Sequence, residues 1–388
     1  MNPSSSTFKF PKKRSLEQLK PYKPGKPAEE LQRELGLKKI YKLASNENLF
    51  GVSKKALKRG KKELKKVNFY PEGKAPKLRK TLSEILNVPE ERLIFGNGTN
   101  ELLHLVVETF CSPGDEVVYP FPSFVVYKIA PKLIPVEEKQ VPLREDFSYD
   151  LEALIEAVSP KTKVIFLANP NNPTGKMVPY EELTQFLRKL RKKTENYEEP
   201  PVVVLDEAYY EFASVDPTYP QSLHPDFVEE FINQMPIVIT RSLSKVYALA
   251  GIRIGYAVAH EALIEQMEKI RQPFNVNRLA QVMAEAALMD ETFIERTVKK
   301  TVESKKFLYR ALEEIGISYI RSWTNFVLIK VGEKNEDLDV FDRLLKKGLI
   351  VRPGSGLGFP GYIRVTVAPI PVMKKFVSAL QEVLENRH

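Results

Sequence analysis

The sequence predicts an α/β protein with a mostly parallel central sheet, a smaller α+β domain and an N-terminal arm. From about residue 95 to residue 260, short apolar runs alternate with amphipathic stretches of helical periodicity, such as 180–193. The apolar runs are 116–119, 164–167, 202–205, 237–240 and 254–258. Strands that are apolar throughout are typical of a parallel sheet whose two faces are both covered by helices.

The pattern changes after Phe274. A long helical region at 278–315 is followed by strands near 326–329 and 363–367, and a closing helix is expected at about 372–385. Runs of helix followed by runs of strand are typical of an α+β domain. We therefore expect a second domain at the C-terminal end of the chain.

Three segments follow from this order of elements. Residues 1–45 are expected to form an N-terminal arm and the start of the small domain. Within the arm, the proline-rich stretch 20–27 resists regular structure, and 28–35 has the pattern of a short helix. The large domain is expected at 62–275 and the small C-terminal domain at 276–388.

Cysteine and histidine usage argues against metal chemistry. Cys111 is the only cysteine, which excludes an intrachain disulfide and a cysteine metal cluster. It follows the apolar end of a predicted helix, so we expect it to be buried. The four histidines share no metal-ligand spacing. We expect no metal site.

Charge and hydropathy also narrow the location and the partners. The formal net charge is +9, but the lysine runs at 54–66 and 299–306 contain no interleaved aromatic residues that would stack on bases. We therefore expect no nucleic-acid partner. No run approaches the roughly 18 apolar residues of a membrane span. The N-terminus lacks the apolar core of a signal peptide, so a cytoplasmic protein without membrane contact is expected.

Polar clusters follow three of the predicted strands directly. They are 169–175, 206–209 and 241–245. Each has an ordinary interpretation when taken alone: a turn rich in Asn and Pro, a helix-capping aspartate and a surface lysine. Ligands of a doubly wound sheet, however, bind beyond the carboxyl ends of its strands. The joint occurrence of the three clusters therefore predicts a single ligand site.

These clusters and several other motifs resemble the fold-type I pyridoxal-phosphate aminotransferases, most closely those that act on histidinol phosphate. The resemblance covers nearly the whole chain. The other motifs are Pro-Tyr-Lys-Pro-Gly at 21–25, Leu-Ala-Ser-Asn-Glu-Asn at 43–48, Tyr-Pro at 70–71, Gly-Asn-Gly-Thr-Asn-Glu at 96–101, Ala-Gly-Ile-Arg-Ile-Gly-Tyr at 250–256 and Ile-Arg-Val-Thr-Val at 363–367. The resemblance implies the fold-type I architecture and pyridoxal 5'-phosphate as cofactor.

Roles for the cofactor ring are implied by the same resemblance. Lys245 would bind the cofactor covalently and move protons during catalysis. Asp206 would face the pyridine nitrogen. Asn172 and Tyr209 would contact the 3′ oxygen, and Phe124 would stack on the ring.

The resemblance also implies a phosphate site and a substrate site. The phosphate ligands would be Thr99 and Asn100 at a helix N-terminus, Ser242, Ser244, Arg253, and Tyr70 from the neighbouring subunit. Sharing Tyr70 in this way implies a homodimer with shared active sites. Arg364 would bind the substrate α-carboxylate, and Arg352, with Tyr22 from the arm of the neighbouring subunit, would bind the terminal phosphate of histidinol phosphate.

The implied reaction converts histidinol phosphate and 2-oxoglutarate into imidazole acetol phosphate and glutamate, in histidine biosynthesis. The chain departs from the family pattern at Leu49, where proline commonly stands, in the loop 354–361 and at Ala368, where glycine is usual. These departures concern the substrate side. An aromatic or broad-specificity aminotransferase and a phosphothreonine decarboxylase therefore stay open as alternatives. A regulator with an aminotransferase-like domain is disfavoured, because only about 45 proline-rich residues precede the first cofactor motif.

Overall fold

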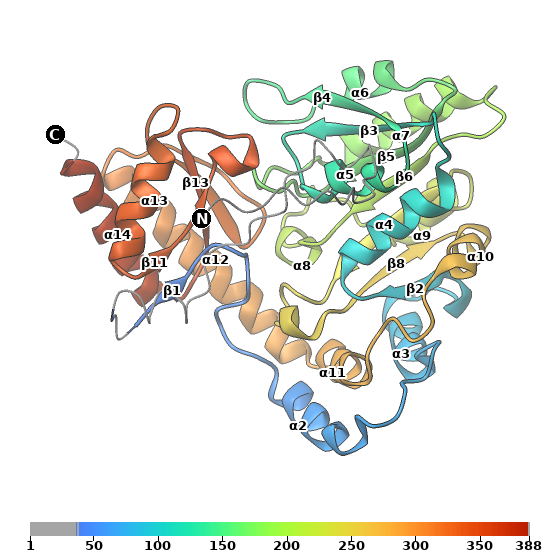
Figure 1. Ribbon diagram of the computed structural model, residues 1–388, viewed down its shortest axis with the longest axis horizontal. Coiled ribbons are helices and arrows are strands. Elements are labelled where there is room, and N and C mark those ends of the chain that lie inside the picture. The colour runs from blue at the N-terminus through green and yellow to red at the C-terminus, as the bar shows by residue number, and fades with distance from the viewer. Residues whose placement is uncertain (1–35, 37–38, 387–388) are drawn as a thin grey trace, which may run out of the picture.

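The central feature of the computed structural model, which describes residue 36 and residues 39–386, is a seven-stranded sheet (Figure 1). Its strand order is β2 (Leu93–Gly96), β8 (Gly255–Ala259), β7 (Ile237–Ser242), β6 (Val202–Asp206), β5 (Thr162–Ala168), β3 (Glu116–Phe121) and β4 (Glu137–Pro142). The five strands from β7 to β4 run parallel, and β8 is antiparallel to both of its neighbours. The prediction of a mostly parallel sheet is confirmed.

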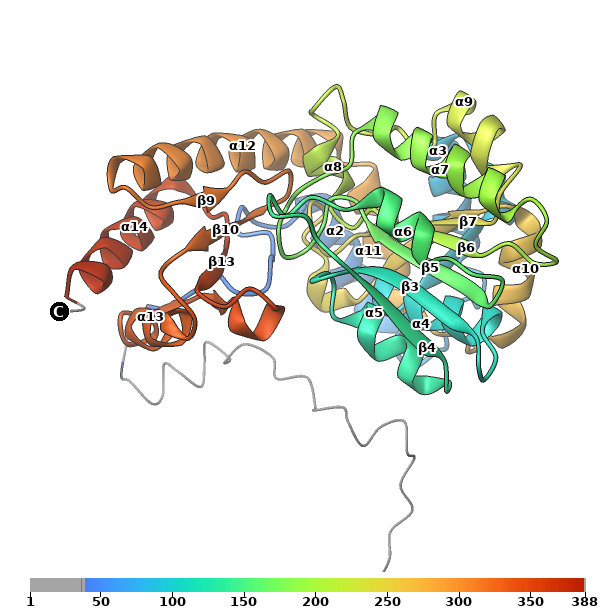
Figure 2. The same cartoon turned by 90° about the horizontal axis from the view of Figure 1, so that it is seen from above.

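Helices cover both faces of this sheet, as expected. Figure 2 shows α6 (Leu151–Ala157) and α7 (Tyr180–Thr194) on one side, and α4 (Thr99–Phe110) and α5 (Val126–Ile129) on the other. Alternate residues of one strand enter opposite cores: Val164 and Phe166 pack toward α4, whereas Ile165 and Leu167 pack toward α7. This period of two explains why each strand reads as apolar throughout.

The remaining helices of this part flank the sheet. They are α2 (Lys54–Glu63), α3 (Pro76–Leu86), α8 (Tyr210–Ala213), α9 (Pro225–Phe227), α10 (Glu261–Ile270) and α11 (Arg278–Leu288).

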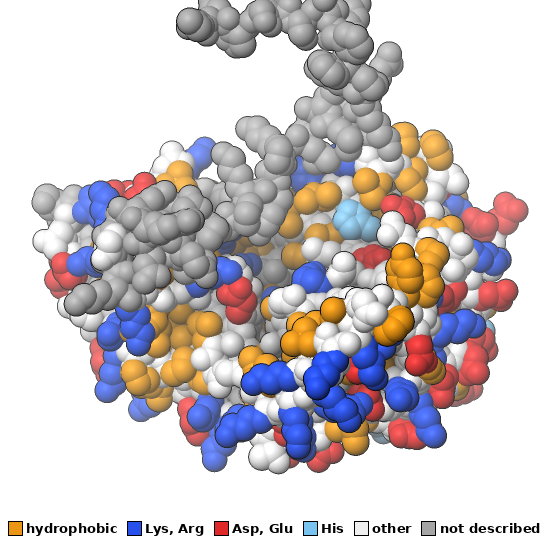
Figure 3. Space-filling model, turned by 60° about the horizontal axis from the view of Figure 1, so that its bottom comes forward, with side chains coloured by type: hydrophobic (Ala, Val, Ile, Leu, Met, Phe, Trp, Pro, Cys, Tyr) orange, Lys and Arg blue, Asp and Glu red, His pale blue; other side chains and the backbone are white. Residues whose placement is uncertain are grey.

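Cys111 caps the end of α4 and is buried, as predicted, and burial raises the pKa of its thiol to about 12. The exposed lysines and arginine of α2 belong to the basic surface at the bottom of Figure 3.

A second, smaller part of the molecule is built on a four-stranded antiparallel sheet. Its strand order is β12 (Arg352–Pro353), β13 (Tyr362–Thr366), β10 (Phe326–Lys330) and β9 (Tyr319–Ile320). It packs with α12 (Glu291–Glu314), α13 (Glu336–Lys346) and α14 (Ile370–Glu385) around one apolar core. A short parallel pair, β1 (Tyr41–Lys42) with β11 (Leu349–Ile350), joins the N-terminal segment to it.

The helical region predicted at 278–315 is two helices, α11 and α12, separated at residues 289–290. The interruption lies at Asp290, whose carboxylate accepts a hydrogen bond from Ser53 at 2.5 Å and so ties the junction to the start of α2. The two helices also have different neighbours: α11 packs on α2 and α3, whereas α12 packs on α14. The domain boundary predicted at residues 275–276, just before α11, stays a prediction.

Two further predictions concern the N-terminal arm and the absence of a membrane span. The extended stretch at 20–27 and the short helix at 28–35 lie outside the described residues. In the part of the chain that is described, no helix combines the length and apolar character that a membrane crossing requires.

Candidate active site

A cavity of about 730 Å³ opens where the parallel strands end, between the large sheet and the small one. Residues at or just beyond the ends of β5, β6 and β7 all line it, among them Asn172, Asp206 and Lys245. The three polar clusters therefore meet, as expected from strands that share a direction. Segments from the small sheet close the cavity from the other side, including Arg352 and Arg364.

Twelve of the fourteen site residues predicted from the sequence line this cavity. They are Thr99, Asn100, Phe124, Asn172, Asp206, Tyr209, Ser242, Ser244, Lys245, Arg253, Arg352 and Arg364. Tyr70 does not line it: the residue is 79% exposed and its ring stacks on Phe274 with centroids 4.9 Å apart. Tyr22 lies outside the described residues.

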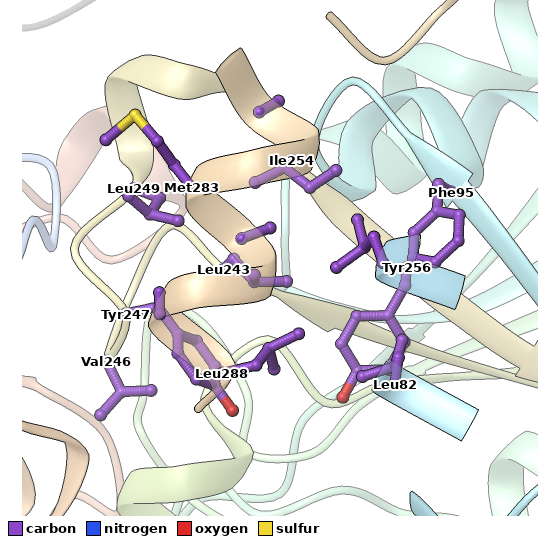
Figure 4. Close-up of a cluster of buried hydrophobic side chains, with 14 of the residues drawn as sticks. Leu82, Phe95, Leu243, Val246, Tyr247, Leu249, Ile254, Tyr256, Met283 and Leu288 are labelled. Carbon is purple, nitrogen blue, oxygen red and sulfur yellow. The ribbon is translucent and has the colours of Figure 1, made fainter. Parts of the chain in front are cut away.

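Lys245 is held by an apolar anchor on the side away from the cavity. It lies in the loop after β7, and the neighbouring side chains of Leu243, Val246 and Leu249 enter a buried cluster (Figure 4). Three backbone hydrogen bonds fix the loop, including one from the Leu249 amide to the Leu243 carbonyl at 3.0 Å. With its neighbours buried, Lys245 projects its ammonium toward the cavity, 5.5 Å from the centre of the Tyr209 ring.

Asp206 is a buried carboxylate at the end of β6. The Tyr127 hydroxyl donates to its Oδ2 at 2.7 Å, and the Thr240 hydroxyl donates to its Oδ1 at 3.2 Å. Burial raises the pKa of Asp206, and these hydrogen bonds oppose that shift. A cation bound next to the carboxylate would favour its ionised form further.

Arg364 connects the small sheet to the large one. It lies on β13, and its guanidinium donates to the Asn172 Oδ1 at 2.5 Å and to the Ala44 carbonyl at 2.8 Å. Its neighbour across the antiparallel pair of β12 and β13 is Arg352. Like charges at directly opposite positions destabilise a sheet. Two arginines placed this way at the rim of one cavity indicate a site for anions.

Asn46 is a site residue that the sequence reasoning left without a role, although it lies within a recognised motif. Its side-chain amide donates to the Tyr209 hydroxyl at 2.9 Å, and its backbone amide donates to the Thr366 hydroxyl at 3.0 Å. The residue has φ of 56°, a left-handed conformation that asparagine tolerates better than most residues. This tolerance was the one signal in the sequence that could have identified it.

Glycines shape an anion cradle at the start of α4. Gly98, with φ of 79°, precedes the helix, and a Cβ there would lie 2.4 Å from a terminal nitrogen of Arg253. A Cβ on Gly255 would lie 2.8 Å from the Thr99 amide nitrogen. The two glycines therefore leave space that lets the guanidinium and the helix N-terminus approach the same point.

The donors around this point fit a phosphate group. They combine backbone amides at a helix N-terminus, the hydroxyls of Ser242 and Ser244, and the guanidinium of Arg253. Such donors bind dianions well, because the helix dipole and a formal charge act together. With Lys245 and Asp206 in the same cavity, the residues fit the pyridoxal phosphate expected from the sequence.

Comparison with known proteins identifies the family. The model of the class I and II aminotransferases matches residues 38–380. The chain is 44% identical to histidinol-phosphate aminotransferase 2 of Carboxydothermus hydrogenoformans, over 96% of this chain and 99% of the relative. It is 40% identical to the histidinol-phosphate aminotransferase of Caldicellulosiruptor saccharolyticus, over 94% and 98%.

A solved structure agrees with these relatives. The histidinol-phosphate aminotransferase of Sinorhizobium meliloti, determined in complex with pyridoxal-5'-phosphate, superposes with a TM-score of 0.86 at 27% identity, covering 99% of this chain and 100% of that one. Aspartate aminotransferase of Thermotoga maritima, at 22% identity, shares the fold with a TM-score of 0.78. By sequence and by fold, the chain belongs to the class I and II aminotransferases and, within them, to the histidinol-phosphate aminotransferase family.

Proposed function

We propose that this chain transfers the amino group of histidinol phosphate to 2-oxoglutarate, giving imidazole acetol phosphate and glutamate in histidine biosynthesis, with pyridoxal 5'-phosphate as cofactor. The observation that carries the proposal is the shared cavity: Lys245, a buried aspartate, an anion cradle and two arginines all line it. The relatives of the same family support the choice of substrate. We also place the protein in the cytoplasm, where small-molecule biosynthesis takes place.

Lys245 performs the proton chemistry. The bound cofactor supplies a ring that accepts electrons from the substrate carbon. The Lys245 amine would hold the cofactor and would move a proton between the substrate Cα and the cofactor C4′. Its half-buried position in the cavity limits competition from water.

Asp206 and its neighbours tune the ring. The carboxylate of Asp206 accepts a hydrogen bond from the pyridine nitrogen and keeps that nitrogen protonated. Asn172 and Tyr209 bind the 3′ oxygen, and Asn46 orients the Tyr209 hydroxyl through its 2.9 Å hydrogen bond. Phe124, whose side chain lines the cavity, stacks on the ring face.

The two arginines bind the anionic ends of the substrates. Arg364 binds the α-carboxylate of glutamate as a bidentate pair, and Arg352 binds the terminal phosphate of histidinol phosphate. Their opposite positions on β12 and β13, in the lining of one cavity, support this assignment because both can reach a bound substrate.

A homodimer with shared active sites completes the proposal. Tyr70 reaches the cofactor phosphate in the cavity of the partner subunit. This placement is supported by its exposure of 79%, by its absence from the lining of its own cavity, and by exposed apolar neighbours. These neighbours are Leu64, Val67, Phe69 and Phe274. Exposed apolar residues gathered in one region are typical of a protein interface.

A panel of amino donors tests the proposed substrate. Turnover of histidinol phosphate, phenylalanine and phosphothreonine should be measured side by side with 2-oxoglutarate as acceptor. We expect histidinol phosphate to give the highest kcat/KM, because only it combines an imidazole with a phosphate for Arg352. A higher kcat/KM for phenylalanine would establish an aromatic aminotransferase instead. Release of carbon dioxide from phosphothreonine would establish a decarboxylase.

Replacing Gly98 with alanine should weaken cofactor binding. The new methyl group would collide with Arg253. In addition, alanine in the left-handed backbone conformation of Gly98 would cost about 1–3 kcal/mol of stability. We expect the dissociation constant for pyridoxal phosphate, measured by equilibrium dialysis, to rise about tenfold or more. Gly114→Ala is the matched control: Gly114 has φ of 94° but open space around it. That variant should lose similar stability and retain cofactor affinity, so equal losses of affinity would contradict the assigned cradle.

A further inference from the structure

Tyr127 is a fully buried residue that contacts two separate parts of the candidate cofactor site. Its hydroxyl donates to Asp206 Oδ2 at 2.7 Å. Its ring meets the edge of Phe124, with centroids 5.8 Å apart and an interplanar angle of 86°. It lies on α5, in the segment that leads from β3 toward β4, whereas Asp206 ends β6. One side chain therefore links the residue proposed for the ring nitrogen to the residue proposed for the ring face.

The ring of Tyr127 is fixed by its other neighbours. It stacks on Phe166 of β5, with centroids 4.7 Å apart and an interplanar angle of 5°, and it contacts Tyr119 edge-on. The Tyr127 amide also donates to the Phe124 carbonyl at 3.0 Å. With the ring held between two strands and its own turn, the hydroxyl has one direction in which to point.

We propose that Tyr127 is a positioning residue for the cofactor: its hydroxyl orients the carboxylate of Asp206 and keeps it ionised, and its ring supports Phe124. The inference rests on the proposed function, because it takes the cavity to hold pyridoxal phosphate. Donors on both carboxylate oxygens favour the charged form, which desolvation by itself opposes. Burial also raises the pKa of Tyr127 well above its ordinary value, so the phenol stays a proton donor.

Other titratable groups surround Asp206 and have to be held constant in a test. Tyr149 stands before α6, Glu207 follows Asp206 in the chain, and Tyr209 lies in the same loop. Lys245 faces the cavity from the loop after β7. Glu207 forms a buried ion pair with Arg241 at 2.8 Å. None of these side chains changes in a variant that only removes the Tyr127 hydroxyl.

The test is the pH dependence of cofactor binding by Tyr127→Phe. The variant keeps the ring contacts and removes one hydrogen bond to the carboxylate, so the pKa of Asp206 should rise. We expect the acid limb of pyridoxal phosphate affinity, measured by equilibrium dialysis at a series of pH values, to move upward by about one pH unit. The acid limb of kcat should move in the same direction. Thr240→Val, which removes the longer hydrogen bond, should give a smaller shift with the same sign.

Tyr149→Phe is the matched control. Tyr149 is also buried near Asp206, but its hydroxyl donates to the Ala168 carbonyl at 2.7 Å. The Tyr149→Phe variant should destabilise the fold without moving the acid limb of pyridoxal phosphate affinity. The inference is overturned by an unchanged acid limb in Tyr127→Phe, or by equal shifts in the two tyrosine variants. A wild-type protein that bound no pyridoxal phosphate would instead overturn the proposed function, so the two failures are distinguishable.

Discussion

Replacing Lys245 with alanine is expected to lower kcat for transamination by at least about 10⁴-fold, with the protein still folded. The variant loses both the cofactor anchor and the group that moves the proton, and general acid–base catalysis alone contributes factors of about 10²–10⁴. The fold should persist, because the apolar anchor of this loop comes from Leu243, Val246 and Leu249. Single-turnover kinetics with histidinol phosphate measure the loss, and circular dichroism checks the fold.

Lys245→Arg serves as the companion variant. Arginine retains a positive charge in the cavity but stays protonated and cannot act as a base. We expect it to be nearly as inactive as the alanine variant. If the arginine variant kept more than about a tenth of wild-type kcat, charge at this position and not the free amine would be the important property.

Replacing Asp206 with asparagine is expected to lower kcat by about 10²–10³-fold, the range typical for loss of one preorganised electrostatic contact in an active site. Asparagine keeps the shape but provides a neutral group beside the pyridine nitrogen, so the ring nitrogen loses the partner that keeps it protonated. The loss should fall on kcat much more than on KM, because the contact acts on developing charge and not on substrate binding.

Asp216→Asn is the matched control for this change. Asp216 accepts a hydrogen bond from the Trp323 indole at 2.9 Å, which contributes to holding the pKa of Asp216 below its ordinary value. It does not line the cavity. This variant should retain wild-type kcat, and comparable losses in the two variants would indicate damage to the fold instead of the chemistry.

The sequence predicted five of the buried strands of the central sheet but missed β2, which is also buried throughout. The strands β5, β6 and β7 appear within two residues of the predicted runs. By contrast, β4 was missed, because its residues Glu137–Pro142 are mostly polar and lie at the edge of the sheet. Charged residues are common on edge strands, where they discourage pairing with other chains. A search for apolar runs passes over such a strand.

The sequence pattern also did not predict the direction of β8. β8 runs antiparallel to both neighbours, yet its residues Gly255–Ala259 are as apolar and as buried as those of a parallel strand. Apolar character reports burial on both faces, and burial does not depend on the direction of the chain. The meeting of the three polar clusters was predictable because it required only that β5, β6 and β7 be parallel.

The polar contacts around the candidate site were predictable only in part. Residues within recognised motifs, such as Asp206 and Lys245, could be assigned by resemblance. Tyr127 and Thr240 could not, since each looks like an ordinary core residue of an apolar segment. Their contacts with Asp206 span 79 and 34 residues of chain, and only the packed fold brings them together.

The lysine that binds the cofactor covalently can be identified chemically. The protein loaded with pyridoxal phosphate should be reduced with borohydride, digested and mapped by mass spectrometry. Lys305 is the most instructive competitor, because burial lowers the pKa of its amine to about 7, although its Nζ donates to the carbonyls of Ser322 and Thr324 at 2.7 and 2.9 Å. We expect the adduct on Lys245. An adduct on Lys305, or on any lysine outside the cavity, would contradict it.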